Sequence, residues 1–504
     1  MTAAVQSGSF EWKELSPGYW ERNIDEWERF YIRSAKTESG CYPVTGFASF
    51  SVDSNIPDNE RVESALRKAW VCLRHRHPSL ASRVAHDETG PVKRTYSALE
   101  GADQDSWLQS TFQTYDTDKY PLAWFNDDAP DFEQASVFLV RTPHGTAVFL
   151  RGPHDITDGI GILLLLHQLF DLASKAYQEG KEFTMPVWGN EAIRLAPCLR
   201  VAAKIPEVLS EAETKWFAAV QAENRRAYSH PSLLCIPASR IPMPSTPSRT
   251  NCVSFLIPRN ITKQILGLCK SISPGVSVTH VFTAALALTL AELQNKKEEE
   301  YPVRYVSHSI INLRPYCDEP YNSADNAAAS CHTISAQTIQ IDLVVPSVSD
   351  RKLDTGKDLR QITLDLKSFY EATRPTCSYT SRVHEQIAVA PAVIKPFTPA
   401  VGFNPHAVTS TSPFCAVPLS SIGDISTVVA AKQGPFELTR VVCLSEAIGP
   451  GLACFMGSWG GELELCAVFD SRYHDPAYIE SFLRTIVDKV CTGLGIDIPS
   501  VSPI

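Results

Sequence analysis

Length, composition and charge restrict the class of protein before any motif is considered. The chain has 504 residues, 44% hydrophobic and 20% charged, which is the composition of a globular protein of more than one domain. The formal net charge of −10 argues against nucleic acid or an anionic membrane as the main partner, because both select basic surfaces.

The N-terminus and the cysteines predict an intracellular setting. The first residues contain no basic segment followed by an apolar run, so no secretory signal is expected. The longest apolar stretch, 160–166, is far shorter than the ~20 residues that a membrane span needs. The 14 cysteines are scattered singly, unlike those of zinc or disulfide frameworks. We therefore expect a cytoplasmic protein with reduced thiols, no metal and no membrane association.

Helices and strands are mixed in the first half of the chain. Residues 64–74 have apolar side chains at helical spacing. The apolar runs 135–140 and 146–150 flank a short connection that contains Pro143-His144-Gly145, which predicts a hairpin. Residues 160–177 form a long apolar segment that predicts a largely buried helix.

A segment rich in proline and serine divides the chain into two parts of similar size. Ile241-Pro242-Met243-Pro244-Ser245-Thr246-Pro247-Ser248 has no apolar period and predicts a linker. We expect an N-terminal domain of residues 1–240, a linker at 241–252 and a C-terminal domain of residues 253–504. In the second part, strands are predicted at 253–257, 305–311, 426–429, 438–444, 453–456 and 462–469, and helices at 262–271, 278–293 and 477–492. The predicted fold class is α/β (α+β), with mixed sheets flanked by helices in two domains.

The segment His154-Asp155-Ile156-Thr157-Asp158-Gly159 carries the clearest chemical signal. It follows an apolar strand that Pro153 ends, and it precedes the predicted buried helix, so His154 lies in a loop on a rigid scaffold. A neutral imidazole accepts a proton near neutral pH, which predicts general-base catalysis. Asp158 is placed to orient the turn through backbone amides or a distant arginine, and Gly159 would allow a positive φ or a close backbone approach. A purely structural histidine is the alternative that the motif alone leaves open.

This segment resembles the His-x-x-x-Asp-Gly signature of the superfamily of chloramphenicol acetyltransferase, plant BAHD acyltransferases and peptide-synthetase condensation domains. Four further segments resemble motifs of condensation-like acyltransferases and occur in the expected order: 22–29, 76–80, 311–316 and 420–424. The chain length and the absence of the plant Asp-Phe-Gly-Trp-Gly motif favour fungal secondary-metabolite enzymes, of which the trichothecene 15-O-acetyltransferases are the nearest kind.

The resemblance implies two chloramphenicol-acetyltransferase-like domains with His154 in a channel at their interface. Acyl-CoA, as a co-substrate rather than a permanently bound cofactor, would enter from one face and a small-molecule alcohol from the other. His154 would deprotonate the alcohol, while Asp158 would be structural and paired with Arg314 or Arg76, of which we favour Arg314. Asn312 and Ser421 are candidates for hydrogen bonds in the channel or to the oxyanion, with ordinary turn or strand-end roles as their alternatives.

The leading hypothesis is thus a CoA-dependent O-acyltransferase, in the simplest case an acetyltransferase, that acts as a monomer on a hydroxyl of a secondary metabolite such as a sesquiterpenoid. One alternative is a transferase whose acyl donor is bound to a carrier protein, which forms esters or amides. Pro153 stands where many condensation domains have a first histidine, and this departure argues against amide formation. The other alternative is a catalytically inactive binding scaffold of the same fold.

Overall fold

The computed structural model describes residues 10–35, 41–53, 58–87, 90–98, 103–241, 248–350, 358–373, 382–400 and 417–497. Half of the predicted linker, 242–247, lies outside the described residues. The division into domains at 241–252 stays a prediction, although strand β9 already begins at Thr250, inside the segment predicted as a linker.

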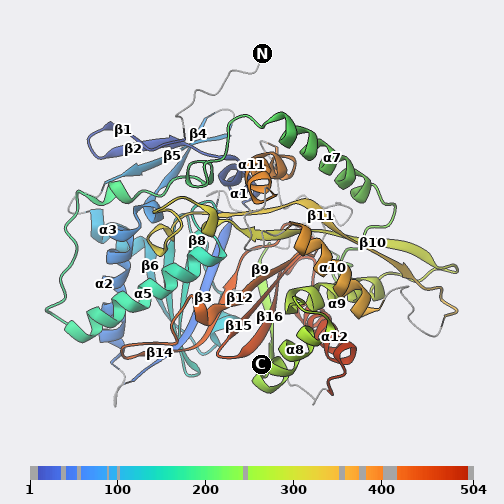
Figure 1. The fold of residues 1–504 in the computed structure, drawn as a ribbon. Coiled ribbons are helices and arrows are strands. Elements are labelled where there is room, and N and C mark those ends of the chain that lie inside the picture. The colour runs from blue at the N-terminus through green and yellow to red at the C-terminus, as the bar shows by residue number, and fades with distance from the viewer. Residues whose placement is uncertain are drawn as a thin grey trace.

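The first half is built around a six-stranded sheet that includes the strand leading to His154 (Figure 1). Its central strands are almost completely buried, since the hydrophobic run 146–150 faces helices on one side and a second sheet on the other. The turn of the predicted hairpin contains Gly145 at φ 134, a backbone conformation that favours glycine. Two strands from the second half of the chain complete the sheet. In spatial order its strands are β13 (Lys432–Gln433), β14 (Phe436–Leu444), β3 (Pro43–Val52), β8 (Gly145–Pro153), β7 (Ser136–Thr142) and β6 (Phe112–Asp116).

Helices α2 (Asn59–Arg76) and α5 (Gly159–Glu179) pack against each other and against one face of this sheet. α5 starts directly after the His154 loop. Among the described residues it is the one helix long and apolar enough to cross a membrane by those two criteria, but 67% of its apolar window is buried in the protein. The helix therefore owes its apolar composition to its place in the core.

A four-stranded sheet organises the second half, and its helices cover one face (Figure 1). The other face contributes Phe455 and Val468 to an apolar cluster with Phe47 and Phe149 of the six-stranded sheet. The two sheets therefore pack face to face. The strand order is β12 (Leu419–Asp424), β15 (Leu452–Trp459), β16 (Glu462–Asp470), β9 (Thr250–Ile257), and the helices are α8 (Arg259–Ile272), α9 (Val278–Glu292), α10 (Leu359–Thr373) and α12 (Pro476–Leu494).

The remaining elements surround these two units. The long antiparallel pair β10 (Tyr301–Asn312) and β11 (His332–Val345) crosses the molecule, with α7 (Glu211–Tyr228) and α11 (Arg382–Ile394) packed against β11 (Figure 1). A second four-stranded sheet holds β1 (Lys13–Ser16), β2 (Tyr19–Asn23), β5 (Gly90–Ser97) and β4 (Arg83–Asp87). The other helices are α1 (Glu26–Ser34), α3 (Asp103–Thr111), α4 (Pro121–Asp127) and α6 (Leu199–Ala202).

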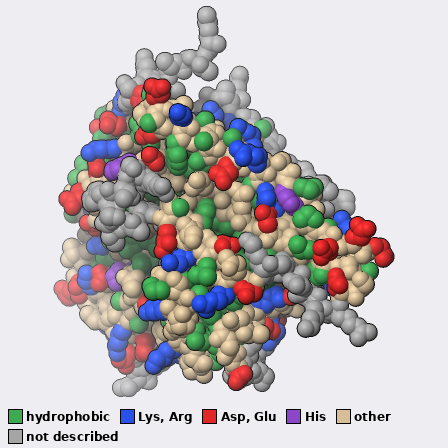
Figure 2. All heavy atoms as spheres, turned by 45° about the vertical axis from the view of Figure 1, so that its right-hand side comes forward, with side chains coloured by type: hydrophobic (Ala, Val, Ile, Leu, Met, Phe, Trp, Pro, Cys, Tyr) green, Lys and Arg blue, Asp and Glu red, His purple; other side chains and the backbone are tan. Residues whose placement is uncertain are grey.

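One predicted strand is wrong. Residues 426–429 do not extend; Ile425–Thr427 form a short 3-10 helix, because the Asp424 carboxylate accepts a hydrogen bond from Ser426 N and starts a turn there. The other predicted helices and strands are present, most of them longer at one or both ends. On the face shown in Figure 2, acidic and basic side chains are interspersed rather than gathered by sign.

Candidate active site

His154 lies in the loop between β8 and α5, and local hydrogen bonds fix both ends of that loop. Its backbone N donates to Tyr42 O at 2.7 Å, which extends the pairing of β8 with β3. Asp158 is the N-cap of α5, and its Oδ1 accepts from Gly161 N at 2.7 Å. A carboxylate at this position satisfies a free N–H of the first helical turn, which is why the helix starts here.

The hydrogen bonds of the His154 ring determine which nitrogen is available for chemistry. Nδ1 lies 3.0 Å from Thr157 O, and because a carbonyl oxygen only accepts, Nδ1 carries the proton. The lone pair is then on Nε2, which has no hydrogen-bond partner among the described residues. Burial lowers the pKa of His154 to about 4, although its backbone hydrogen bonds and the Asp158 charge act in the opposite direction. The imidazole is therefore neutral at neutral pH.

Aromatic side chains hold the His154 ring. Tyr31 stacks on it with a centroid distance of 4.0 Å and an interplanar angle of 8°. The His332 ring lies 5.2 Å away, and its Nε2 is hydrogen bonded to Tyr31 Oη at 2.7 Å. Burial, and then the neighbouring His154, lower the pKa of His332 to about 3, so this second imidazole is also neutral. Tyr42 completes the group at 6.1 Å from His154.

Asp158 joins the loop to the second half of the chain. Its Oδ2 accepts from Cys331 N at 2.6 Å and lies 3.4 Å from Arg314 Nη2. Burial alone would raise the pKa of this carboxyl, but the Arg314 charge and the N–H donors of Gly161 and Cys331 outweigh it, and the pKa lies below its ordinary value. Asp158 is therefore ionised, and each of its two oxygens accepts a backbone hydrogen bond.

Of the two predicted arginine partners, the structure brings Arg314 to Asp158. Arg314 is 5% exposed and also donates to Asn326 O at 2.7 Å and Ala329 O at 2.9 Å. Arg76 lies elsewhere and donates to Gln168 Oε1 at 3.1 Å.

The glycine that the loop requires is Gly161 rather than Gly159. Gly159 lines the cavity described below but does not have a positive φ, so this part of the prediction for it is wrong. A Cβ on Gly161 would lie 2.5 Å from both Ala327 O and Thr157 Oγ1, a distance that real Cβ atoms do not show. The close approach of the second half of the chain therefore excludes any side chain at residue 161.

The two predicted channel residues both line the cavity next to His154. Asn312 ends β10, and its Oδ1 also accepts from Arg314 N at 3.0 Å, so it shapes the turn that carries Arg314. Ser421 lies on β12, and its Oγ accepts from Thr279 Oγ1 at 2.9 Å. Its own hydroxyl hydrogen is therefore available to an oxygen in the cavity.

Two adjoining cavities meet at the aromatic group around His154. The histidine cavity, of about 300 Å³, is lined by His154, Asn312 and Ser421 among others. The apolar cavity, of about 550 Å³, extends from it towards Ile394 and Phe397. Residues that line both cavities are Phe30, Tyr31, Tyr42, Ile310, His332, Pro418, Glu446 and Ala453.

Sequence reasoning missed the residues that surround the catalytic candidate. Tyr31 follows the recognised segment 22–29 on helix α1, and a search of the same helical face one turn further on would have found it. His332 had no local signal, because β11 brings it to the site from far along the chain. Among the described residues, no group of three or more His, Cys, Asp or Glu is arranged to hold a metal ion.

The chain is similar in sequence to two fungal acetyltransferases, to one of them over nearly its whole length. It is 25% identical over 496 residues to acetyltransferase pigO of Monascus ruber, which covers 96% of this chain and 98% of that protein. It is 24% identical over 321 residues to O-acetyltransferase pigM of the same organism, which covers 63% of this chain and 59% of that protein. No protein-family model matches the chain.

Solved structures share the fold. Trichothecene 15-O-acetyltransferase TRI3 of Fusarium sporotrichioides superimposes with a TM-score of 0.76 at 16% identity, over 97% of this chain and 99% of that one. The first condensation domain of the calcium-dependent antibiotic synthetase gives 0.57 at 13% identity, over 99% and 100%. The chloramphenicol-acetyltransferase-like fold class and the resemblance to condensation-like acyltransferases are thereby confirmed. Together with the acetyltransferase relatives, the TRI3 structure also confirms the prediction of an acyltransferase.

Removing the Asp158 carboxylate should destabilise the fold. Asp158→Ala leaves the Arg314 guanidinium buried beside two N–H groups that have lost their acceptor, which costs about 3–5 kcal/mol. Urea unfolding measures this loss. Asp171→Ala is the matched control, because Asp171 pairs with Lys175 on the exposed face of the same helix and its loss should cost about 0.5 kcal/mol or less. Equal stabilities of the two variants would contradict the account of Asp158.

The pH dependence of the reaction should reflect the low pKa of His154. A base whose pKa is about 4 stays deprotonated from pH 8 down to about pH 5, so kcat/KM should be insensitive to this group over that range. The rate should fall only below about pH 5, as the imidazole takes up a proton. Circular dichroism at each pH separates this effect from unfolding. An acid limb near pH 6.5 would show that the ring is solvated instead of buried.

Proposed function

We propose that the protein transfers an acyl group, acetyl in the simplest case, from acyl-CoA to a hydroxyl of an apolar secondary metabolite, with His154 as general base. The observation that carries the proposal is the pairing of Nδ1 with Thr157 O, which leaves the Nε2 lone pair on the ring that lines the histidine cavity. The acetyl donor is supported by the names of the relatives, acetyltransferase pigO and O-acetyltransferase pigM.

The proposed reaction has one proton acceptor and no covalent acyl-enzyme. His154 Nε2 takes the hydroxyl proton as the acceptor oxygen attacks the thioester carbonyl. The C–O bond forms, the C–S bond breaks, and the proton on Nε2 passes to the departing CoA thiolate. The imidazolium that exists during the reaction is stabilised by the buried Asp158 charge, which raises the pKa of His154 against the effect of burial.

Two side chains are candidates for stabilising the oxyanion. Ser421 keeps its hydroxyl hydrogen free because it accepts from Thr279. Tyr31 Oη lies where the two cavities meet, 2.7 Å from His332 Nε2, and its hydrogen is available to an oxyanion in the tautomer in which His332 Nε2 donates to it. Removing one oxyanion donor from a desolvated site typically lowers kcat by about 10²–10³.

The apolar cavity suits a bulky acceptor with few polar groups. At about 550 Å³ it lies within the ~300–1,000 Å³ of small-molecule sites. Its described lining is formed mainly by Trp27, Ile334, Ile394, Phe397 and Leu452. A terpenoid or polyketide skeleton gains free energy by burying its surface there, while one hydroxyl reaches His154.

The function is tested by release of CoA. Wild-type protein, acetyl-CoA and a panel of hydroxylated terpenoids should liberate free thiol, and His154→Ala should lower the rate by about 10²–10⁴. His144→Ala is the matched control, because His144 is exposed in the turn between β7 and β8, and it should retain full activity. Thiol release by His154→Ala at the wild-type rate would remove the general base from the proposal.

The assignment of the acceptor is tested at Ala453, which lines both cavities. Ala453→Phe should fill the junction and raise KM for a bulky terpenoid alcohol about tenfold or more, while a short primary alcohol should be affected much less. Ala219→Phe, on the exposed side of α7, is the control and should change neither constant. An equal effect on both alcohols would contradict the use of this junction by the acceptor.

A further inference from the structure

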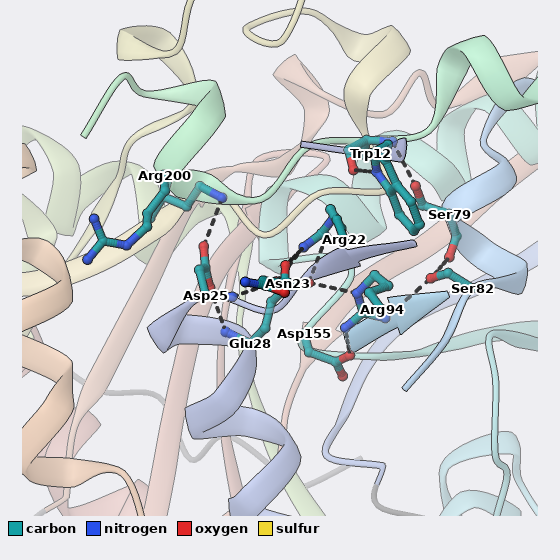
Figure 3. Close-up of polar contacts among 12 residues, drawn as sticks. Trp12, Arg22, Asn23, Asp25, Glu28, Ser79, Ser82, Arg94, Asp155 and Arg200 are labelled. Carbon is teal, nitrogen blue, oxygen red and sulfur yellow. Dashed lines mark hydrogen bonds and ion pairs between the residues drawn. The ribbon is translucent and has the colours of Figure 1, made fainter. Parts of the chain in front are cut away.

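A chain of buried ion pairs ends at Asp155, the residue that follows His154 (Figure 3). Arg22 donates through Nη1 and Nη2 to the two oxygens of Glu28, each at 2.7 Å. Arg94 donates through Nε to Glu28 Oε1 at 2.7 Å and through Nη2 to Asp155 Oδ2. Each of the four residues is 5% exposed or less. Two positive and two negative charges are thus paired in the interior.

The elements that carry these residues connect the network to the candidate active site. Glu28 lies on α1, three residues before Tyr31 and so on the same side of that helix. Asp155 directly follows His154, and Tyr31 and His154 are the stacked rings. Arg94, on β5, therefore holds with one guanidinium both backbone segments that bring the stacked rings together.

The network is not built to bind a ligand. The cavity beside Arg22, Glu28, Arg94 and Asp155 has a volume of about 10 Å³, enough for one water molecule. A contribution to the stability of the fold does not account for this network, since replacing a whole buried ion pair by apolar side chains is often neutral or stabilising. The planar guanidinium of an arginine does fix the relative positions of two carboxylates, because carboxylates that are bound through different nitrogens of one rigid group cannot move independently.

We propose that Arg94 is a positioning residue for the transfer reaction. By bridging Glu28 and Asp155 it holds Tyr31 flat against His154, which keeps Nδ1 on Thr157 O and directs Nε2 into the histidine cavity. The inference rests on the proposed function of His154 as general base. It extends that proposal to a residue that does not line the histidine cavity.

The test uses Arg94→Lys, which keeps the charge but offers one nitrogen where the arginine uses two to reach both carboxylates. We expect kcat to fall about 10- to 100-fold, as for a small misplacement of a reacting group, with KM for acetyl-CoA within about twofold of wild type. We also expect the acid limb of the pH profile to move up from about pH 4, since a loosened ring is better solvated. Asp158, Tyr31, Tyr42 and His332 are the titratable groups that face the ring, and all are unchanged in the variant.

Arg472→Lys is the matched control. Arg472 is buried and holds Asp470 through Nη2 at 2.8 Å, after β16 and outside both cavities. It should lose stability but keep the wild-type kcat and pH profile. If Arg94→Lys, measured at equal folded content, behaves as Arg472→Lys does, the role of Arg94 is only structural and the inference is overturned.

A second variant keeps the test decisive if Arg94→Lys does not fold. The double substitution Arg94→Met with Asp155→Asn removes one charge of each sign and leaves the pair of Arg22 and Glu28 intact. It should fold and show the same loss of kcat, and a wild-type kcat would overturn the inference. Assay of His154→Ala separates the two proposals. If that variant is active, the general base is wrong; if it is inactive while the Arg94 variants are fully active, only the positioning by Arg94 is wrong.

Discussion

The Asp158 carboxylate is the contact on which the geometry of the site depends. One oxygen caps α5 through Gly161 N, and the other accepts from Cys331 N beside the Arg314 guanidinium. The same side chain therefore starts the helix that follows the His154 loop and ties that loop to β11, which carries His332. Because this one carboxylate bonds to both segments, the two halves of the chain are held in one relative position at the place where His154 meets the cavities.

Burial determines both the protonation state and the base strength of His154. Taking the His154 ring out of water keeps it neutral, with a pKa near 4, so it is always ready to accept a proton but is a weaker base than a solvated imidazole. The Asp158 charge acts against the effect of burial and favours the protonated ring. In the proposed reaction, the imidazolium therefore meets a fixed charge rather than reorienting solvent.

The elements that flank His154 could be predicted from the sequence. The features that could not be predicted have a common cause, which is that they depend on contacts between distant parts of the chain. The hairpin before His154 and the buried helix after it follow from local patterns, and the pairing candidates of Asp158 follow from the family resemblance. The entry of β14 into the sheet of the first half does not, because strand pairing over such a distance leaves no periodic signal. His332 was missed for the same reason. Gly161 was overlooked because only the approach of Ala327 O reveals why a side chain is excluded there.

In the proposed reaction, Nε2 of His154 faces the reacting hydroxyl in a cavity shared by both halves of the chain. A crystal structure of the protein with CoA and an acceptor alcohol tests it most directly. We expect the hydroxyl oxygen within about 2.6–3.2 Å of Nε2, with the acceptor skeleton in the apolar cavity and Nδ1 still bonded to Thr157 O. An acceptor bound away from His154, or a ring turned so that Nδ1 faces the hydroxyl, would contradict it.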